Sequence, residues 1–190
     1  RTANYLYKWT GDVTYADFIE RNLYNGILAQ QHPETGMVAY FLPMASGYKK
    51  GGEKGWGHPT MDFYCCHGSL VQAQTRYLRY IYYEDNNGLT ISQYIPSHLS
   101  WQKDNAKIDI EQDFEGNQWT KNYNAPRWRI IMKVKTDKPV TIPITLRLPW
   151  WLDKKAKISV NGNPIQVNKL HGYIQINRTW NNDQVVIEFA

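Results

Sequence analysis

The chain has 190 residues and a formal net charge of +5, from 22 Lys and Arg against 17 Asp and Glu. The basic residues are scattered singly or in pairs, without the basic stripe that nucleic-acid-binding proteins carry, and no apolar run reaches the 18 residues of a membrane-spanning helix. We therefore expect neither a nucleic acid nor a membrane as a partner, and a chain long enough to bury a substantial core.

Two helical segments open the chain. Residues 1–9 have the pattern of the last two turns of a helix, and Thr10-Gly11-Asp12 is its stop signal. Because this helix has no start signal, we expect a missing N-terminal segment and hence a longer protein. A second helix is predicted over Thr14–Gln31, with Thr14 as its N-cap and Asp17 three residues later, as in a capping box.

The next segment contains a turn and a long loop. Met37–Met44 is an apolar run of strand length. The stretch from Ala45 to Pro59 has five glycines, three lysines and almost no aliphatic residues. This composition predicts a long exposed loop, and such loops in compact domains are often functional.

The loop leads to Cys65 and Cys66, the only cysteines of the chain. Three- and four-residue spacing of apolar side chains predicts a helix right behind them, over about Ser69–Tyr83. A helix N-terminus stabilises negative charge, so thiolates here could attack carbon or bind zinc. The alternatives are two buried core thiols or a strained vicinal disulfide.

Two thiolates do not complete a zinc site. Zinc needs four protein donors in a structural role, or three and an open position in a catalytic one. The other candidate ligands of the chain are His58, His67, Asp62 and Glu53. None of them stands at the spacing of a zinc finger or zinc ribbon, so the residues alone leave the metal open.

Helical spacing gives way to alternation after the polar turn at residues 84–88. Val140–Leu148 is the clearest alternating segment, and Asn161-Gly162 is a hairpin turn signal. About eight such short strands predict an antiparallel β-sandwich. We therefore expect a helical domain over residues 1–87 and a β-sandwich domain over residues 88–190.

A tryptophan pair follows the clearest strand. Trp150 and Trp151 could stack against sugar rings if both are exposed, although such residues commonly seal a domain interface. A non-catalytic carbohydrate-binding sandwich, with a structural zinc or thiol pair, is therefore an alternative to an enzyme.

Several motifs, in a preserved order, together resemble one family. These motifs are Trp9-Thr10-Gly11-Asp12, Tyr15-Ala16-Asp17, residues 20–28 (ERNLYNGIL), Phe63-Tyr64-Cys65-Cys66, Tyr94-Ile95-Pro96-Ser97 and residues 146–151 (LRLPWW). The pattern is similar to glycoside hydrolase family 127 and its relatives, the zinc-thiolate β-L-arabinofuranosidases. The resemblance covers nearly the whole chain and implies the last helices of an (α/α)6 barrel, which carries the active site, followed by a β-sandwich.

The resemblance also implies roles for individual residues. Cys65 would be the nucleophile, Cys65 and Cys66 would bind Zn2+, and Tyr40 would be a substrate-binding tyrosine. The other zinc ligands, a Glu-x-Cys motif, and the acid/base glutamate would lie in the preceding barrel segment. His67-Gly68 stands where Pro-Pro or Thr-Gly is usual in the family.

The implied activity is retaining hydrolysis of β-L-arabinofuranosyl or similar linkages in an oligo- or polysaccharide. Without the barrel segment, we expect the isolated chain to be inactive. The sequence leaves the localisation of the protein open.

Overall fold

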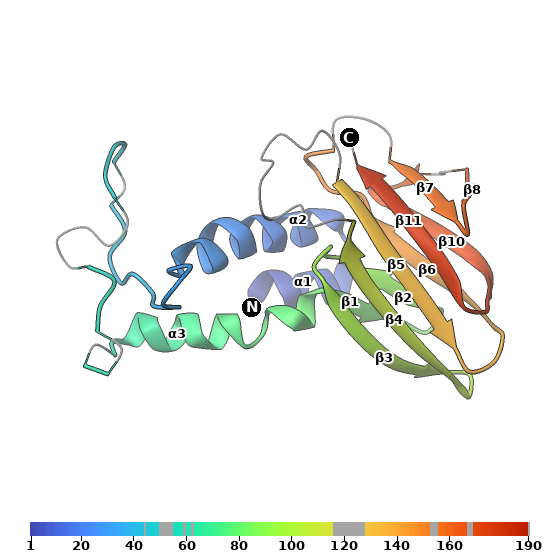
Figure 1. Ribbon diagram of the computed structural model, residues 1–190, viewed down its shortest axis with the longest axis horizontal. Helices are drawn as coiled ribbons and strands as arrows, with labels where there is room; N and C mark the ends of the chain where they lie inside the picture. The colour runs from blue at the N-terminus through green and yellow to red at the C-terminus, as the bar shows by residue number, and fades with distance from the viewer. Residues whose placement is uncertain are drawn as a thin grey trace. The chain divides into compact units, whose positions relative to one another are not determined.

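Figure 1 shows the computed structural model of the chain, with two β-sheets packed face to face and helices formed by the N-terminal part. The structure describes residues 1–43, 45–49, 55–58, 60–61, 63–115, 128–152, 156–166 and 169–189. Packing divides the chain into two units, Arg1–Asp17 with Ile81–Ala190 and Phe18–Tyr80. The domain boundary expected at residues 87 and 88 stays a prediction, since α1 and the first residues of α2 belong to the unit that contains the sheets.

The first two helices lie where the sequence predicts them. α1 spans Thr2–Thr10 and ends at Gly11, which has a left-handed φ of 66° and donates its N–H to the carbonyl of Tyr7. α2 spans Val13–Asn22 and continues as a π-helical turn over Leu23–Ile27 and a 3-10 turn over Leu28–Gln30. The predicted second helix is therefore present, but its second half is irregular.

The predicted N-cap of α2 is wrong. Asp12, rather than Thr14, caps the helix, because Asp12 Oδ1 accepts hydrogen bonds from the Thr14 N–H at 2.9 Å and from Thr14 Oγ1 at 2.8 Å. The backbone hydrogen bond from Thr14 is the largest cause that holds the pKa of Asp12 below its usual value. Asp17, the expected capping-box partner, pairs instead with an arginine of the sheets.

α3 begins earlier than predicted, at Cys65 rather than Ser69, and spans Cys65–Gln74. It starts there because Tyr64 is extended and its N–H donates to Nδ1 of His67 at 3.0 Å, which satisfies the helix start from the third helical position. A 3-10 turn over Tyr77–Tyr80 follows, and strand β1 takes over at Tyr82, so the helix is also shorter than predicted.

The strand expected over Met37–Met44 is wrong. Within the described residues of this run, Val38 forms only an isolated antiparallel bridge to Gln31. The N–H of His32 closes the turn before it, with a 2.7 Å hydrogen bond to the carbonyl of Met37. Met44 lies outside the described residues. An apolar run needs a neighbouring strand for its backbone hydrogen bonds, and only one residue pair supplies them here.

Two sheets form the sandwich. The first sheet has the order β1-β2-β6-β10-β9, with strands Tyr82–Glu84, Leu89–Ile91, Val140–Arg147, Tyr173–Trp180 and Lys169–Leu170. The second has the order β3-β4-β5-β11-β7-β8, with strands Ser97–Lys103, Ala106–Phe114, Trp128–Thr136, Asp183–Phe189, Lys157–Val160 and Asn163–Pro164. All described pairs are antiparallel except β2 with β6. The predicted order of helices followed by a mostly antiparallel sandwich is confirmed.

The core of the sandwich follows from alternation along the strands. On β6, Val140, Ile142, Ile144 and Leu146 are buried, and they meet buried residues of the second sheet such as Ile110, Val134 and Ile187. Burial of apolar surface of this kind is the main favourable term in folding. The predicted turn at Asn161-Gly162 is also present, with φ values of 52° and 80° that suit the tight hairpin between β7 and β8.

A buried arginine ties α2 to the sheets within this unit. The Arg147 side chain is 0% exposed, and its Nη1 lies 2.6 Å from Oδ1 of Asp17. Its Nε donates to the carbonyl of Ser92, and its own carbonyl accepts the Tyr94 hydroxyl at 2.6 Å. The neighbouring Gln93 donates from Nε2 to the carbonyl of Ala16 at 3.1 Å. The arginine is therefore charged, buried and held by several partners.

In the part of the chain that the structure describes, no helix has both the length and the apolar character needed to cross a membrane.

The Arg147–Asp17 pair gives a prediction for stability. Asp17→Leu should lower the free energy of unfolding by about 3–5 kcal/mol, because it leaves a buried charge without its partner. Adding Arg147→Met should recover much of that loss, because no charge then stays buried. Urea unfolding of the full-length protein, followed by tryptophan fluorescence, measures both variants.

The matched control is Glu111→Gln, which removes an ion pair to Lys133 whose two side chains are about half exposed. Its effect should stay below about 1 kcal/mol. An Asp17→Leu effect as small as that of the control would contradict the importance of the buried pair.

Candidate functional site

The cysteine pair lies in the unit Phe18–Tyr80, at the start of α3. Cys65 and Cys66 are its first two residues, and both are free and exposed in this chain. Their sulfur atoms are 3.8 Å apart. The structure therefore differs from two of the alternatives left open by the sequence, the buried core thiols and the vicinal disulfide.

Tyr40 reaches this pair from the segment before the loop. Its hydroxyl oxygen is 3.9 Å from Sγ of Cys65. Its ring packs edge-on against Tyr64, with centroids 5.1 Å apart, and lies 5.3 Å from the ring of His67. The structure thus brings together Tyr40, Cys65 and Cys66, the three residues that were predicted as site residues. Their roles stay predictions.

The contacts between Tyr40 and the cysteine pair shift the pKa values of Tyr40 and Cys65. The Tyr40 hydroxyl is the largest cause of a lowered pKa for the Cys65 thiol, followed by the hydrogen bond to Cys66. In turn, hydrogen bonds to Cys66 and Cys65 raise the pKa of Tyr40 to about 12. The two shifts describe one arrangement, in which tyrosine keeps its proton and donates it toward a cysteine thiolate. A thiolate at the first turn of a helix is also favoured by the unpaired N–H groups there.

Of the other candidate metal ligands, the structure describes His58 and His67, and neither forms a metal-binding group with the two sulfur atoms. Nδ1 of His67 is occupied by the Tyr64 N–H at 3.0 Å, and Nδ1 of His58 lies 3.2 Å from the Thr60 N–H. Among the residues that the structure describes, no three His, Cys, Asp or Glu side chains form a group that could hold a metal ion. Glu53 and Asp62 lie outside the described residues.

The two sulfur atoms nevertheless fit one edge of a zinc site. Thiolates bound about 2.3 Å from one tetrahedral zinc ion lie about 3.8 Å from each other. The Sγ–Sγ distance is 3.8 Å, and the adjacent cysteines of α3 therefore need no rearrangement of their spacing to share one ion. They supply two donors, so further ligands are required.

The sequence analysis did not predict the structural role of His67 at the start of α3. It considered His67 only as a candidate ligand, whereas the imidazole closes the start of α3 and packs against Tyr40. The signal that could have found it is its position, two residues after Cys65, where a capping-box side chain reaches back to the residue before the helix.

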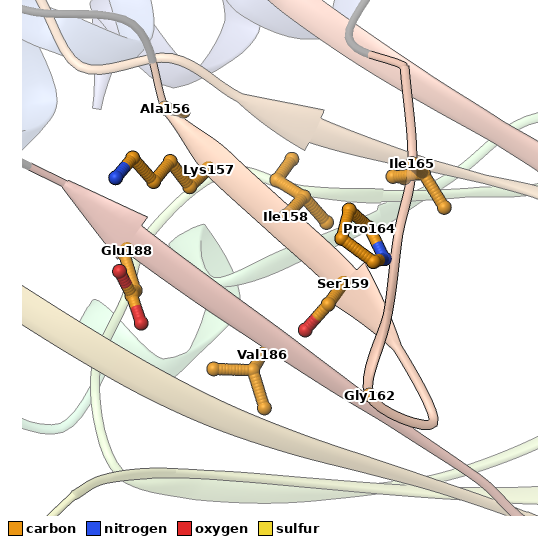
Figure 2. A pocket seen from close by; sticks show the side chains of 9 residues that line it. All are labelled: Ala156, Lys157, Ile158, Ser159, Gly162, Pro164, Ile165, Val186 and Glu188. Carbon is orange, nitrogen blue, oxygen red and sulfur yellow. The ribbon is translucent and has the colours of Figure 1, made fainter.

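A separate pocket lies on the sandwich and contains none of the predicted site residues. It has a volume of ≈ 380 Å³, and Figure 2 shows Lys157 and Ser159 of β7 beside Val186 and Glu188 of β11, with Pro164 at its rim. Its lining has no aromatic side chain on which a sugar could stack.

Two family models match the chain. The model described as "Beta-L-arabinofuranosidase, GH127 catalytic domain" matches residues 1–79, and the one described as "Beta-L-arabinofuranosidase, GH127 middle domain" matches residues 88–190, which is more than half of the chain. The chain belongs to glycoside hydrolase family 127. Its helical part is the end of the GH127 catalytic domain and its β-sandwich is the middle domain. No individually curated protein matches the chain.

Solved structures agree with this assignment at the level of the fold. A GH127 β-L-arabinofuranosidase from Geobacillus stearothermophilus T6 is 22% identical, with a TM-score of 0.74 over 99% of this chain and 30% of that one. The GH127 β-arabinofuranosidase BT3674 is 24% identical, with a TM-score of 0.77 over 97% of this chain and 30% of that one. This GH127 chain therefore spans about 30% of the length of the solved relatives.

The Tyr40 contact predicts how the reactivity of Cys65 depends on pH. Because the tyrosine hydroxyl lowers the pKa of Cys65, Tyr40→Phe should raise that pKa toward the value of an ordinary thiol. In the chelator-treated full-length protein, the pH midpoint for alkylation of Cys65 by iodoacetamide should therefore move upward. Fragmentation mass spectrometry of the peptide that contains both cysteines measures alkylation at each position.

Tyr48→Phe is the matched control, because Tyr48 is an exposed tyrosine of the same unit. It should leave the midpoint of Cys65 unchanged. If Tyr40→Phe and the unsubstituted protein had the same midpoint, the result would contradict a hydrogen bond from the Tyr40 hydroxyl to Cys65.

Proposed function

We propose that this chain supplies part of the active site of a retaining β-L-arabinofuranosidase, with Cys65 as its nucleophile and an oligo- or polysaccharide as its substrate. The observation that carries the proposal is an exposed thiol at the first turn of α3 with a tyrosine hydroxyl 3.9 Å from its sulfur. The hydrogen bond lowers the pKa of this thiol, which favours the nucleophilic thiolate form. Membership of GH127 supports a glycosidic bond as the target.

The proposed reaction has two steps. Cys65 Sγ attacks the anomeric carbon, the bond from that carbon to the leaving oxygen breaks, and a carboxylic acid elsewhere in the protein protonates that oxygen. A thioglycosyl intermediate results. Water then attacks the same carbon while the carboxylate accepts its proton, and Cys65 leaves as the thiolate. Two displacements at one carbon retain its configuration.

Tyr40 has two tasks in this proposal. Its hydroxyl donates toward the Cys65 thiolate, which holds the sulfur atom in one orientation and stabilises the charge that returns when the intermediate breaks down. Its position beside the nucleophile also suits contact with the bound sugar. The raised pKa, about 12, supports its acting as a donor rather than as a base.

Cys65 and Cys66 would hold zinc through their sulfur atoms, together with ligands from outside the described residues. When bound, zinc supplies the positive charge that keeps thiolates deprotonated at neutral pH. The support within this chain is the Sγ–Sγ distance of 3.8 Å. The pair on a helix start also orients Cys65 so that its sulfur keeps a fixed place relative to Cys66.

The second candidate function is a carbohydrate-binding sandwich, and one observation favours it. Trp150 is 55% exposed, whereas Trp151 packs against Trp128 and Phe189, with ring centroids 5.3 and 5.8 Å apart. Of these two tryptophans, Trp150 is the one whose exposed ring could stack on a sugar. Arabino-oligosaccharide binding by the full-length Cys65→Ser protein, measured by calorimetry and abolished by Trp150→Ala, would favour this candidate. Unchanged binding would count against it.

The role of Cys65 predicts a selective loss of activity. Cys65→Ser should lower kcat/KM on aryl β-L-arabinofuranoside by roughly three orders of magnitude or more, because the nucleophile is lost. A panel of other aryl glycosides defines the sugar. Melting temperatures of Cys65→Ala and Cys66→Ala serve as the control, because a catalytic nucleophile can be lost with folding intact, whereas a purely structural zinc site would give equal, large losses for both. Full activity of Cys65→Ser would end the proposal.

The count of donors predicts the metal content. The full-length protein should hold stoichiometric zinc, and Cys66→Ser should reduce it, since the pair supplies two of the ligands. The isolated 190-residue chain should be largely metal-free and inactive, because two thiolates bind zinc far more weakly than four converging donors. Elemental analysis after dialysis against a weak chelator measures the zinc content of the full-length protein, the Cys66→Ser variant and the isolated chain. Tightly held zinc in the isolated chain would contradict this count and would make His58, His67 or Glu53 the candidates for the missing ligands.

A further inference from the structure

His67 is joined to the residue before the cysteine pair by two hydrogen bonds. The ring nitrogen Nδ1 of His67 accepts a hydrogen bond from the backbone N–H of Tyr64 at 3.0 Å. The backbone N–H of His67 donates to the backbone carbonyl of Tyr64, also at 3.0 Å. Cys65 and Cys66 are the two residues between these partners. The short stretch of backbone that carries both cysteines is therefore closed by two hydrogen bonds between Tyr64 on one side and His67 on the other.

The His67 ring also packs against the aromatic residues around the sulfur atoms. Its centroid lies 5.3 Å from that of Tyr40, 5.6 Å from that of Tyr64 and 6.4 Å from that of Phe63, with the last pair stacked. The His67 residue is only 9% exposed in this chain. The tyrosine that contacts Cys65 thus rests on a ring that the helix start holds in place.

From these contacts, we propose that His67 is a positioning residue for the cysteine nucleophile. It acts through the Tyr64 backbone and the Tyr40 ring and does not itself touch the reacting atoms. The neutral imidazole with its proton on Nε2 is the form that fits, since Nδ1 must accept the Tyr64 N–H. The inference rests on the proposed role of Cys65 and adds a residue that orients it.

Two substitutions separate the two contacts of His67. A glutamine at this third helical position keeps an acceptor that can reach back to the residue before the helix, as in a capping box, but has no ring. A phenylalanine keeps a ring for Tyr40 but has no acceptor. The hydrogen bond fixes the backbone of both cysteines, whereas the ring contact reaches Cys65 only through Tyr40, so we expect the hydrogen bond to matter more.

In the full-length protein, His67→Phe should lower kcat by between about tenfold and 100-fold, the range that a small misplacement of reacting groups produces. KM should stay within about threefold, so that kcat and kcat/KM fall together, as expected when an interaction acts in the transition state. His67→Gln should keep kcat within about threefold of the unsubstituted protein. Rescue by glutamine is the result that a general packing role would not give.

Activities are measured well below the lowest melting temperature of the set, so that loss of stability does not enter them. His98→Phe is the control, because His98 is an exposed histidine on β3. If His67→Phe does not fold, His67→Ala replaces it and should show the same loss of kcat with rescue only by glutamine. Full kcat in His67→Phe or His67→Ala, or equal losses in the glutamine and phenylalanine variants, would overturn the inference.

This outcome is distinguishable from failure of the proposed function. An inactive Cys65→Ser protein together with a fully active His67→Phe protein would refute only the positioning role. An active Cys65→Ser protein would refute the nucleophile itself.

Discussion

The buried charge of Arg147 constrains how the start of α2 packs on the sheets of its unit. A guanidinium without water needs partners for its charge and its N–H groups, and it finds them in Asp17 of α2 and in the carbonyl of Ser92. Since Arg147 lies on β6, in the middle of its sheet, the start of α2 must stay beside that strand. This explains why α1 and residues up to Asp17 cluster with the sandwich, although the family model assigns them to the catalytic domain. The packing boundary and the family boundary differ because the Arg147–Asp17 ion pair crosses between the two segments, together with hydrogen bonds such as those from Gln93 to Ala16 and from Tyr173 to Gly11.

The sandwich could be predicted from sequence because its determinants are local and periodic. Alternation along β6 fixes which side chains face the core, and Asn161-Gly162 fixes a turn through its positive φ values. The start of α3 could not be predicted in this way. Its closing group is His67, and histidine is not among the residues expected at a helix start, so apolar spacing placed the start too late. The strand prediction for the run that starts at Met37 was wrong for another reason. A strand depends on a partner strand, and the sequence of the run itself does not show whether a partner is present.

The candidate site was predictable as chemistry but not as geometry. Two adjacent cysteines near a helix start indicate thiolate chemistry from the physics of that position, and the resemblance to GH127 pointed to Tyr40. The contact between Tyr40 and Cys65 joins residues separated by the glycine-rich loop, and no spacing rule predicts how such a loop returns. The opposed pKa shifts of Tyr40 and Cys65 follow from the contacts among Tyr40, Cys65 and Cys66. The geometry of a metal site is harder still to predict, because this chain spans about 30% of the length of its solved relatives. In the part of the chain that the structure describes, the cysteine pair offers only two sulfur donors.

The pairing of β2 with β6, which is the one parallel pair among the described strands, has a consequence for how the protein folds during synthesis. Leu89 of β2 pairs with Ile144 of β6, although the strands β3, β4 and β5 are made between them. At a translation rate of about 5–20 residues per second, β2 waits roughly 3–10 s for its partner to leave the ribosome. Throughout that interval Leu89 and Ile91, which are buried in the finished fold, have an incomplete core around them. Closure of the first sheet is therefore a late, non-local event, while the hairpin of β3 with β4 forms from neighbouring residues as soon as both are made.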